Sequence, residues 1–146
     1  MYHILKLFII IHQTLIVFVM MTLSNFLQKM KEFEAYPDHE FYFLSIVDSS
    51  LLPINTIEQK GIPDISSIND CIVFHSSKRT KSNTVDKIIK KLYKIITTKE
   101  KAEELNVVYF NSITNEYGFI FNDLNVFDIC EKNKRIQCRI VLQDLL

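Results

Sequence analysis

Apolar and polar positions alternate along the chain in patterns that divide it into short elements. The clearest pattern has apolar side chains recurring every three or four positions, with lysines on the opposite side. The apolar positions are Val85, Ile88, Ile89, Leu92, Ile95 and Ile96, and the basic positions are Lys87, Lys90, Lys91 and Lys94. This spacing predicts an amphipathic helix with one buried stripe. Asn83 or Thr84 can cap its start, and Asp86 in the first turn suits the helix dipole.

A two-stranded hairpin is predicted directly after this helix. Residues Leu105–Asn111 are rich in β-branched and aromatic side chains, and Phe119–Phe121 form a second short run of the same kind. The segment Thr114–Gly118 between them contains turn-forming residues. Because Gly118 is one of only two glycines in the chain, we place it in the turn.

The first half of the chain predicts one more helix and several strands. A helical stripe of apolar residues ends before Pro37, and its members are Leu23, Phe26, Leu27, Met30 and Phe33. Six of the seven residues in Phe41–Val47 are apolar, which suits a buried helix or a buried strand, and the proline and acidic residues before it favour a helix. Strands are predicted at Asn55–Ile62, at Cys71–Phe74 and, near the C-terminus, at Ile136–Leu142.

The N-terminal segment is unusually apolar. The stretch Leu7–Leu23 is nearly all apolar but is broken by His12, Gln13 and Thr14, and its seventeen residues are at the short limit for a membrane-spanning helix. No small-residue cleavage site follows it, as a signal peptide would require. Three interpretations remain open: a membrane or secretory segment, a buried core helix, or an upstream extension outside the working protein. We therefore treat residues 1–21 as an apolar leader and residues 22–146 as a single domain.

Net charge indicates no particular class of partner, because seventeen basic and seventeen acidic residues cancel. The local distribution is more informative, since nine basic residues between Lys78 and Lys101 face only Asp86 and Glu100. A basic surface of this kind can bind phosphate or an acidic partner, although exposed helix faces are commonly charged. The candidate contacts for RNA or an acidic partner are Lys78, Arg79 and Lys81.

The sequence contains no strong catalytic or metal-binding motif. The three cysteines, Cys71, Cys130 and Cys138, have no zinc-site spacing, and their odd number suits a reducing compartment. We expect Cys71 and Cys138 to be buried, and we expect no cofactor and no metal. His75 follows an apolar strand and could act as a general base, but the sequence shows no partner for it, so an ordinary strand end is the favoured interpretation.

Three segments carry a resemblance to a known family. They are Ile57–Asp64 (IEQKGIPD), Cys71–Phe74, and the hairpin formed by Asn106–Ser112 with Gly118–Leu124. Together with the order of elements, they resemble the small non-catalytic subunit of the eukaryotic tRNA-splicing endonuclease, the Sen-fifteen family. The resemblance covers roughly residues 24–128 and rests on element order and residue class.

The resemblance implies a fold and a role. The fold would be α+β: a small mixed sheet with packed helices and a C-terminal antiparallel hairpin, like the catalytic domain of tRNA-intron endonucleases. The role would be that of a nuclear subunit that pairs with a catalytic subunit and contacts precursor tRNA indirectly. Active subunits cleave RNA with a tyrosine, a histidine and a lysine. We cannot place that trio here, so we expect no catalytic residues of its own.

Two other functions remain as alternatives. One is a membrane-anchored α+β protein with an N-terminal apolar helix, which would be membrane-associated if residues 7–23 form a true span. The other is an independent nuclease or other enzyme that uses His75.

The apolar strands of the second half suggest where a partner would bind. Unpaired strand edges associate readily with other strands, so we expect pairing with the catalytic subunit or, for the isolated chain, with a second copy. The candidate interface residues are Val107, Tyr109, Phe119, Phe121, Ile136 and Ile140.

Overall fold

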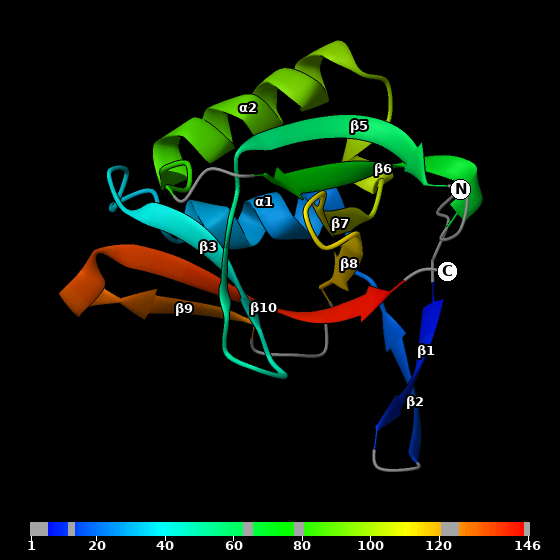
Figure 1. Ribbon diagram of the computed structural model, residues 1–146. Coiled ribbons are helices and arrows are strands. Elements are labelled where there is room, and N and C mark those ends of the chain that lie inside the picture. The colour runs from blue at the N-terminus through cyan, green and yellow to red at the C-terminus, as the bar shows by residue number, and fades with distance from the viewer. Residues whose placement is uncertain (1–5, 12–13, 63–65, 78–80, 121–125, 145–146) are drawn as a thin grey trace.

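The computed structural model describes residues 6–11, 14–62, 66–77, 81–120 and 126–144. This part of the chain forms two α-helices and a curled eight-stranded mixed sheet that resembles half of a barrel (Figure 1). The predicted α+β class, with helices packed on a mixed sheet, is therefore confirmed.

The sheet has the strand order β4-β3-β10-β8-β7-β6-β5, with β9 paired to β10 outside this path. Two pairs are parallel, β6 with β7 and β3 with β10, and the others are antiparallel. The strands are β3 (Glu40–Ser45), β4 (Leu51–Pro53), β5 (Thr56–Ile62), β6 (Ser66–Ser76), β7 (Val107–Asn111), β8 (Glu116–Phe119), β9 (Phe127–Cys130) and β10 (Arg135–Asp144). The strands at the two ends of this path, β4 and β5, are consecutive in the chain, so the sheet curls back toward its own start.

Two of the three predicted helices are confirmed. Helix α1 (Leu23–Lys31) is capped by Thr22, and α2 (Val85–Thr98) is capped by Thr84, whose hydroxyl accepts from the Lys87 N–H. Helix α2 connects the parallel strands β6 and β7, as a crossover between parallel strands requires. Short 3-10 helices follow at η1 (Ala102–Glu104) and η2 (Glu131–Asn133).

The main core lies between the two helices and one face of the sheet. Phe26 of α1 is fully buried at its centre, and its ring contacts aromatic rings from β3, from β6 and from the start of β9. These rings belong to Phe41, Phe43, Phe74 and Phe127, at centroid distances of 5.0 to 6.4 Å. The apolar stripe of α2 closes the same core, which explains its helical periodicity.

The helix favoured for Phe41–Val47 is wrong, because this segment forms strand β3 and the turn after it. Phe41, Phe43 and Ser45 are buried and the residues between them are half-buried, which is the alternation of a strand. Strand β3 pairs in parallel with β10, so the secondary structure of this segment is determined by a strand more than ninety positions away. Pro37 accordingly precedes a turn and does not open a helix.

The prediction that Gly118 lies in the turn is also wrong, because Gly118 lies within β8. The turn of the hairpin is made by Asn115, which has a positive φ of 58°. Gly118 pairs with Tyr109 of β7 and Leu142 of β10, where its missing side chain makes room for neighbouring ones.

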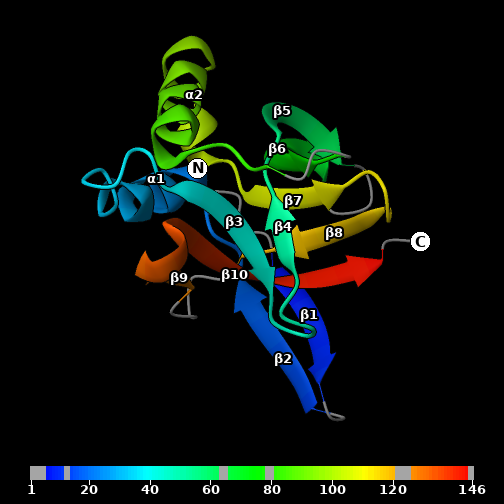
Figure 2. The same ribbon diagram turned by 60° about the vertical axis from the view of Figure 1, so that its left-hand side comes forward.

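The N-terminal segment forms strands, so its interpretation as a buried core helix is wrong, and its interpretation as a membrane or secretory segment stays a prediction. Strands β1 (Lys6–Ile11) and β2 (Thr14–Val19) pair as an antiparallel hairpin in a separate two-stranded sheet. Figures 1 and 2 show this hairpin extending away from the main sheet. Within the described residues, no helix is long and apolar enough to cross a membrane.

The chain enters the main fold at Met20 and Met21, both of which are buried. The Met21 N–H donates to the carbonyl of Ile120, and the Met21 carbonyl accepts from Val107. These two residues therefore belong to the folded body. The predicted leader, residues 1–21, thus includes two residues of the folded body, and that the leader is an unused extension stays a prediction.

Candidate functional site

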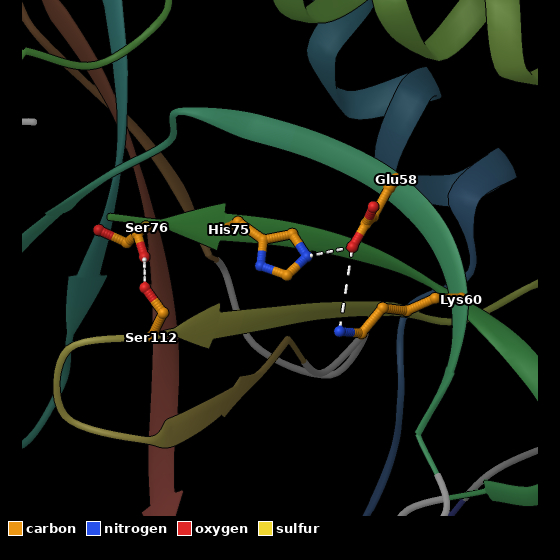
Figure 3. A network of polar contacts seen from close by, with 5 residues as sticks. All are labelled: Glu58, Lys60, His75, Ser76 and Ser112. Atoms are coloured by element: carbon orange, nitrogen blue, oxygen red, sulfur yellow. Dashed lines mark hydrogen bonds and ion pairs between the residues drawn. The ribbon is translucent and has the colours of Figure 1, made fainter. Parts of the chain in front are cut away.

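The best candidate site is a polar network on the face of the sheet opposite the helices. The His75 Nε2 atom of β6 lies 2.8 Å from Glu58 Oε1 of β5, and Lys60 Nζ lies 3.9 Å from the same oxygen. Figure 3 shows the three side chains converging between the two strands. Sequence reasoning found His75 but neither of its two partners.

Strand register explains why these side chains meet. In the antiparallel pair β5–β6, Thr56 lies opposite His75 and Glu58 lies opposite Val73. Residues at every second position point to the same face, so Glu58 and His75 are diagonal neighbours within reach of each other. Pairing Asn55–Ile62 with Cys71–Phe74 as a hairpin would have indicated this contact from the sequence.

Aromatic rings extend the site across the next two strands. Phe110 lies opposite His75 in the parallel register of β6 and β7, and their rings meet edge to face at 5.7 Å. The Tyr117 ring lies 4.7 Å from that of Phe110, and Lys60 Nζ is 5.8 Å from the Phe110 centroid. The network thus combines a carboxylate, an imidazole, an ammonium and an aromatic platform.

The arrangement has the elements of a general base, because a carboxylate that binds one imidazole nitrogen orients the ring for proton transfer.

The side chain of His75 is 16% exposed and that of Glu58 is 54% exposed. Ion pairs at exposed positions contribute only about 0–1 kcal/mol to stability. The described residues contain no group of three or more metal-ligating side chains.

Two serines beside this network, Ser76 and Ser112, join the ends of neighbouring strands. Ser112, just beyond β7, donates from both its N–H and its hydroxyl to the carbonyl of Ser76, in each case at 3.2 Å. Ser76 follows His75 directly, and Figure 3 shows its side chain pointing away from the imidazole. The Ser76–Ser112 contact therefore holds β6 to the end of β7 and places no hydroxyl on the His75 ring.

The predicted basic contacts are only partly described. Lys78 and Arg79 lie outside the described residues. Lys81 is exposed, and its carbonyl accepts from the side-chain amide of Asn55 at 3.3 Å.

The predicted interface residues lie inside this chain. The side chains of Val107, Tyr109, Phe119, Ile136 and Ile140 are fully buried, and Phe121 is outside the described residues. Strands β7, β8 and β10 each lie between two neighbours in the sheet. The expectation that these strands leave an edge open is therefore wrong, because the curled sheet pairs them internally.

The expected burial of two cysteines is confirmed. Burial raises the pKa of the Cys71 thiol to about 11, with Asp70 adding to the effect, and burial also raises the pKa of Cys138. Cys130 is only half-buried.

Comparison with known proteins does not assign this chain to a family. No protein-family model, curated protein or solved structure matches the chain.

Proposed function

We propose that this chain is a non-catalytic structural subunit of the tRNA-splicing endonuclease, which pairs with a catalytic subunit and supports intron removal from precursor tRNA. The observation that carries the proposal is the order of elements. A helix precedes the strands of the main sheet, an amphipathic helix connects two parallel strands, and a hairpin follows. The resemblance of residues 24–128 implies this order and an endonuclease-like domain.

The surroundings of His75 support an accessory role. Its Nε2 atom is engaged by Glu58, and the edge of its ring rests on Phe110. These contacts connect the edge strand β5 to β6 and β7. A structural role of this kind accounts for the histidine without a reacting group.

The free edges of the sheet indicate where a partner would bind. Within the described residues, β5 pairs only with β6, β4 pairs only with β3, and the four-residue strand β9 pairs only with β10. Strand β4 has three residues, one of them Pro53, which lacks an N–H. The seven residues of β5 offer the longer edge, so we propose that a strand of the catalytic subunit adds there.

Affinity purification of the full chain from its native cells, followed by mass spectrometry, tests the assignment. Recovery of the other splicing-endonuclease subunits is the expected result. A chain that reproducibly recovers none of them would refute the proposal.

Proline scanning tests the docking edge. Successive N–H groups of a strand point alternately toward β6 and toward the free edge. One of the variants Glu58→Pro and Gln59→Pro should therefore weaken capture of the catalytic subunit while leaving the melting temperature close to that of the wild type. Its neighbour should destabilise the fold, which makes each variant the control for the other.

The His75–Glu58 pair favours a second candidate, an enzyme that uses His75 as its base. In a reconstituted complex, His75→Ala should change precursor-tRNA cleavage by no more than a few-fold if the chain is accessory. Loss of a general base costs about a hundredfold or more. A decrease of that size would identify His75 as catalytic and overturn the accessory role.

A further inference from the structure

A polar pocket between α2 and the start of β5 lies apart from the His75 network. Its volume is about 280 Å³. Ile57 and Ile88 contribute buried apolar groups, and Lys87 and Lys91 come from successive turns of α2. The side chains of Asn55 and Asn83 complete the wall.

The charge of this pocket is positive and uncompensated. Among the described residues, neither Lys87 nor Lys91 has an ion-pair partner, and no acidic side chain lines the pocket. Lys90, on the same helix, is in contrast 3.0 Å from Asp86. Like charges four residues apart disfavour a helix, so two free lysines at this spacing would be stabilised by a bound anion.

The wall of the pocket is held in place by its own hydrogen bonds. Asn55 accepts from the N–H and hydroxyl of Ser77 and donates to the carbonyl of Lys81, and Asn83 donates to the carbonyl of Asn55. The amides therefore shape the pocket, and the recognition of an anion falls to the lysines.

The first N–H groups of α2 are also occupied. The Val85 and Asp86 N–H groups donate to the carbonyls of His39 and Pro37, and that of Lys87 donates to the Thr84 hydroxyl. The helix terminus therefore contributes no free donor, which again leaves the two lysine side chains to bind the ligand.

We propose that this pocket binds a phosphate group, with the ammonium groups of Lys87 and Lys91 on its oxygens and the attached sugar or base against Ile57 and Ile88. Lysine binds phosphate as a point charge. The volume is close to the lower limit of small-molecule sites, about 300 Å³, which suits one phosphate with its sugar. The phosphate could come from the backbone of single-stranded RNA or from a free mononucleotide.

The test uses the full chain and three probes: inorganic phosphate, a 5′-mononucleotide and a short single-stranded RNA, each titrated by calorimetry. The double variant Lys87→Gln with Lys91→Gln should bind the mononucleotide or RNA about tenfold more weakly or worse, because it loses two charge-assisted contacts. The control, Lys94→Gln with Lys99→Gln, removes the same charge from α2 and its C-cap, outside the pocket, and should bind within about twofold of wild type.

The probes also distinguish the sources of the phosphate. RNA that binds more tightly than the mononucleotide would indicate a backbone phosphate, and equal affinities would indicate a free one. Equal losses in both double variants would reveal a general basic surface and overturn the proposal, as would no binding of any probe at millimolar concentration. The assay needs no second protein, so its failure is distinct from a failure to recover endonuclease subunits.

Discussion

Replacing Gly118 by alanine should destabilise the protein more than a small side chain usually does. Gly118 lies in β8, between β7 and β10. An added Cβ would come within 2.5 Å of Ile140 Cδ1 and 3.1 Å of the Cβ and Cδ2 atoms of Tyr109. Both neighbours are fully buried, so neither can move into solvent.

The geometry sets the size of the effect. Overpacking a core typically costs about 1–3 kcal/mol. Ile140 Cδ1 ends a flexible side chain and can rotate, but Tyr109 Cβ is fixed to the backbone of β7. We therefore expect a loss of about 2–3 kcal/mol in the free energy of unfolding, in the upper part of that range. For a chain of this length each 1 kcal/mol lowers the melting temperature by about 2–4 °C, which calorimetry or circular dichroism resolves.

Gly61 provides a matched control, because a Cβ there would meet only Asp70 Oδ1, at an ordinary 3.5 Å. Gly61→Ala should leave stability unchanged or raise it by about 0.4–1 kcal/mol. Adding Ile140→Val to Gly118→Ala removes the closest atom, so the double variant should lose less than the sum of the two single losses. A Gly118→Ala protein that melts with the wild type, or strictly additive losses, would refute the steric argument.

Three further predictions concern buried polar groups. Ser82→Ala should lower the free energy of unfolding by about 1–3 kcal/mol, because the buried hydroxyl donates to the Phe41 carbonyl and accepts from the Ile54 N–H. Urea unfolding measures this loss, and a variant as stable as the wild type would contradict the prediction. Tyr109→Phe should change the free energy of unfolding by no more than about 1 kcal/mol, since the buried Tyr109 Oη makes no hydrogen bond of standard geometry among the described residues, while the side chains of Ser76 and Asn111 lie close enough to oppose the rise in its pKa that burial causes; a larger loss would show that one of these two side chains bonds to it. With the pKa of Cys71 raised to about 11, only about one Cys71 thiol in a thousand is ionised to thiolate at pH 8. Iodoacetamide should therefore label Cys130 before Cys71, which mass spectrometry can follow. Faster labelling of Cys71 would contradict its burial.

The helices could be predicted from the sequence because the signals that form them are local. Helix α2 needs an apolar residue every three or four positions and a cap at Thr84, and both can be read from consecutive residues. The same holds for α1, whose stripe and Thr22 cap lie within one short segment.

Strand β3 could not be predicted in this way, because its residues suit two structures equally. Phe41–Val47 has the apolar content of a buried helix, and only its pairing with Ile136 and its neighbours in β10 selects the strand. The prediction for Gly118 was wrong for a related reason. A glycine favours turns locally, but here the contacts of Tyr109 and Ile140 across the sheet require it.

The candidate site shows the same dependence on register. His75 has no partner within its own segment, and Glu58 reaches it only when β5 and β6 are aligned with Thr56 opposite His75. The pocket at Lys87 and Lys91 likewise requires α2 to pack beside the start of β5, which the periodicity of the helix alone does not specify.

The expectation of open edges at β7, β8 and β10 was wrong because apolar strands were taken to be edges. Strands such as β7 and β10 are apolar because neighbours cover them on both sides, and apolar edges would favour aggregation. The true edges carry the features that prevent it: Glu58 and Lys60 are exposed on β5, and Pro53 lies on β4. A partner that adds to β5 must therefore satisfy backbone hydrogen bonds beside charged side chains. Its affinity should depend on charge complementarity more than on apolar area, and capture should weaken as ionic strength rises.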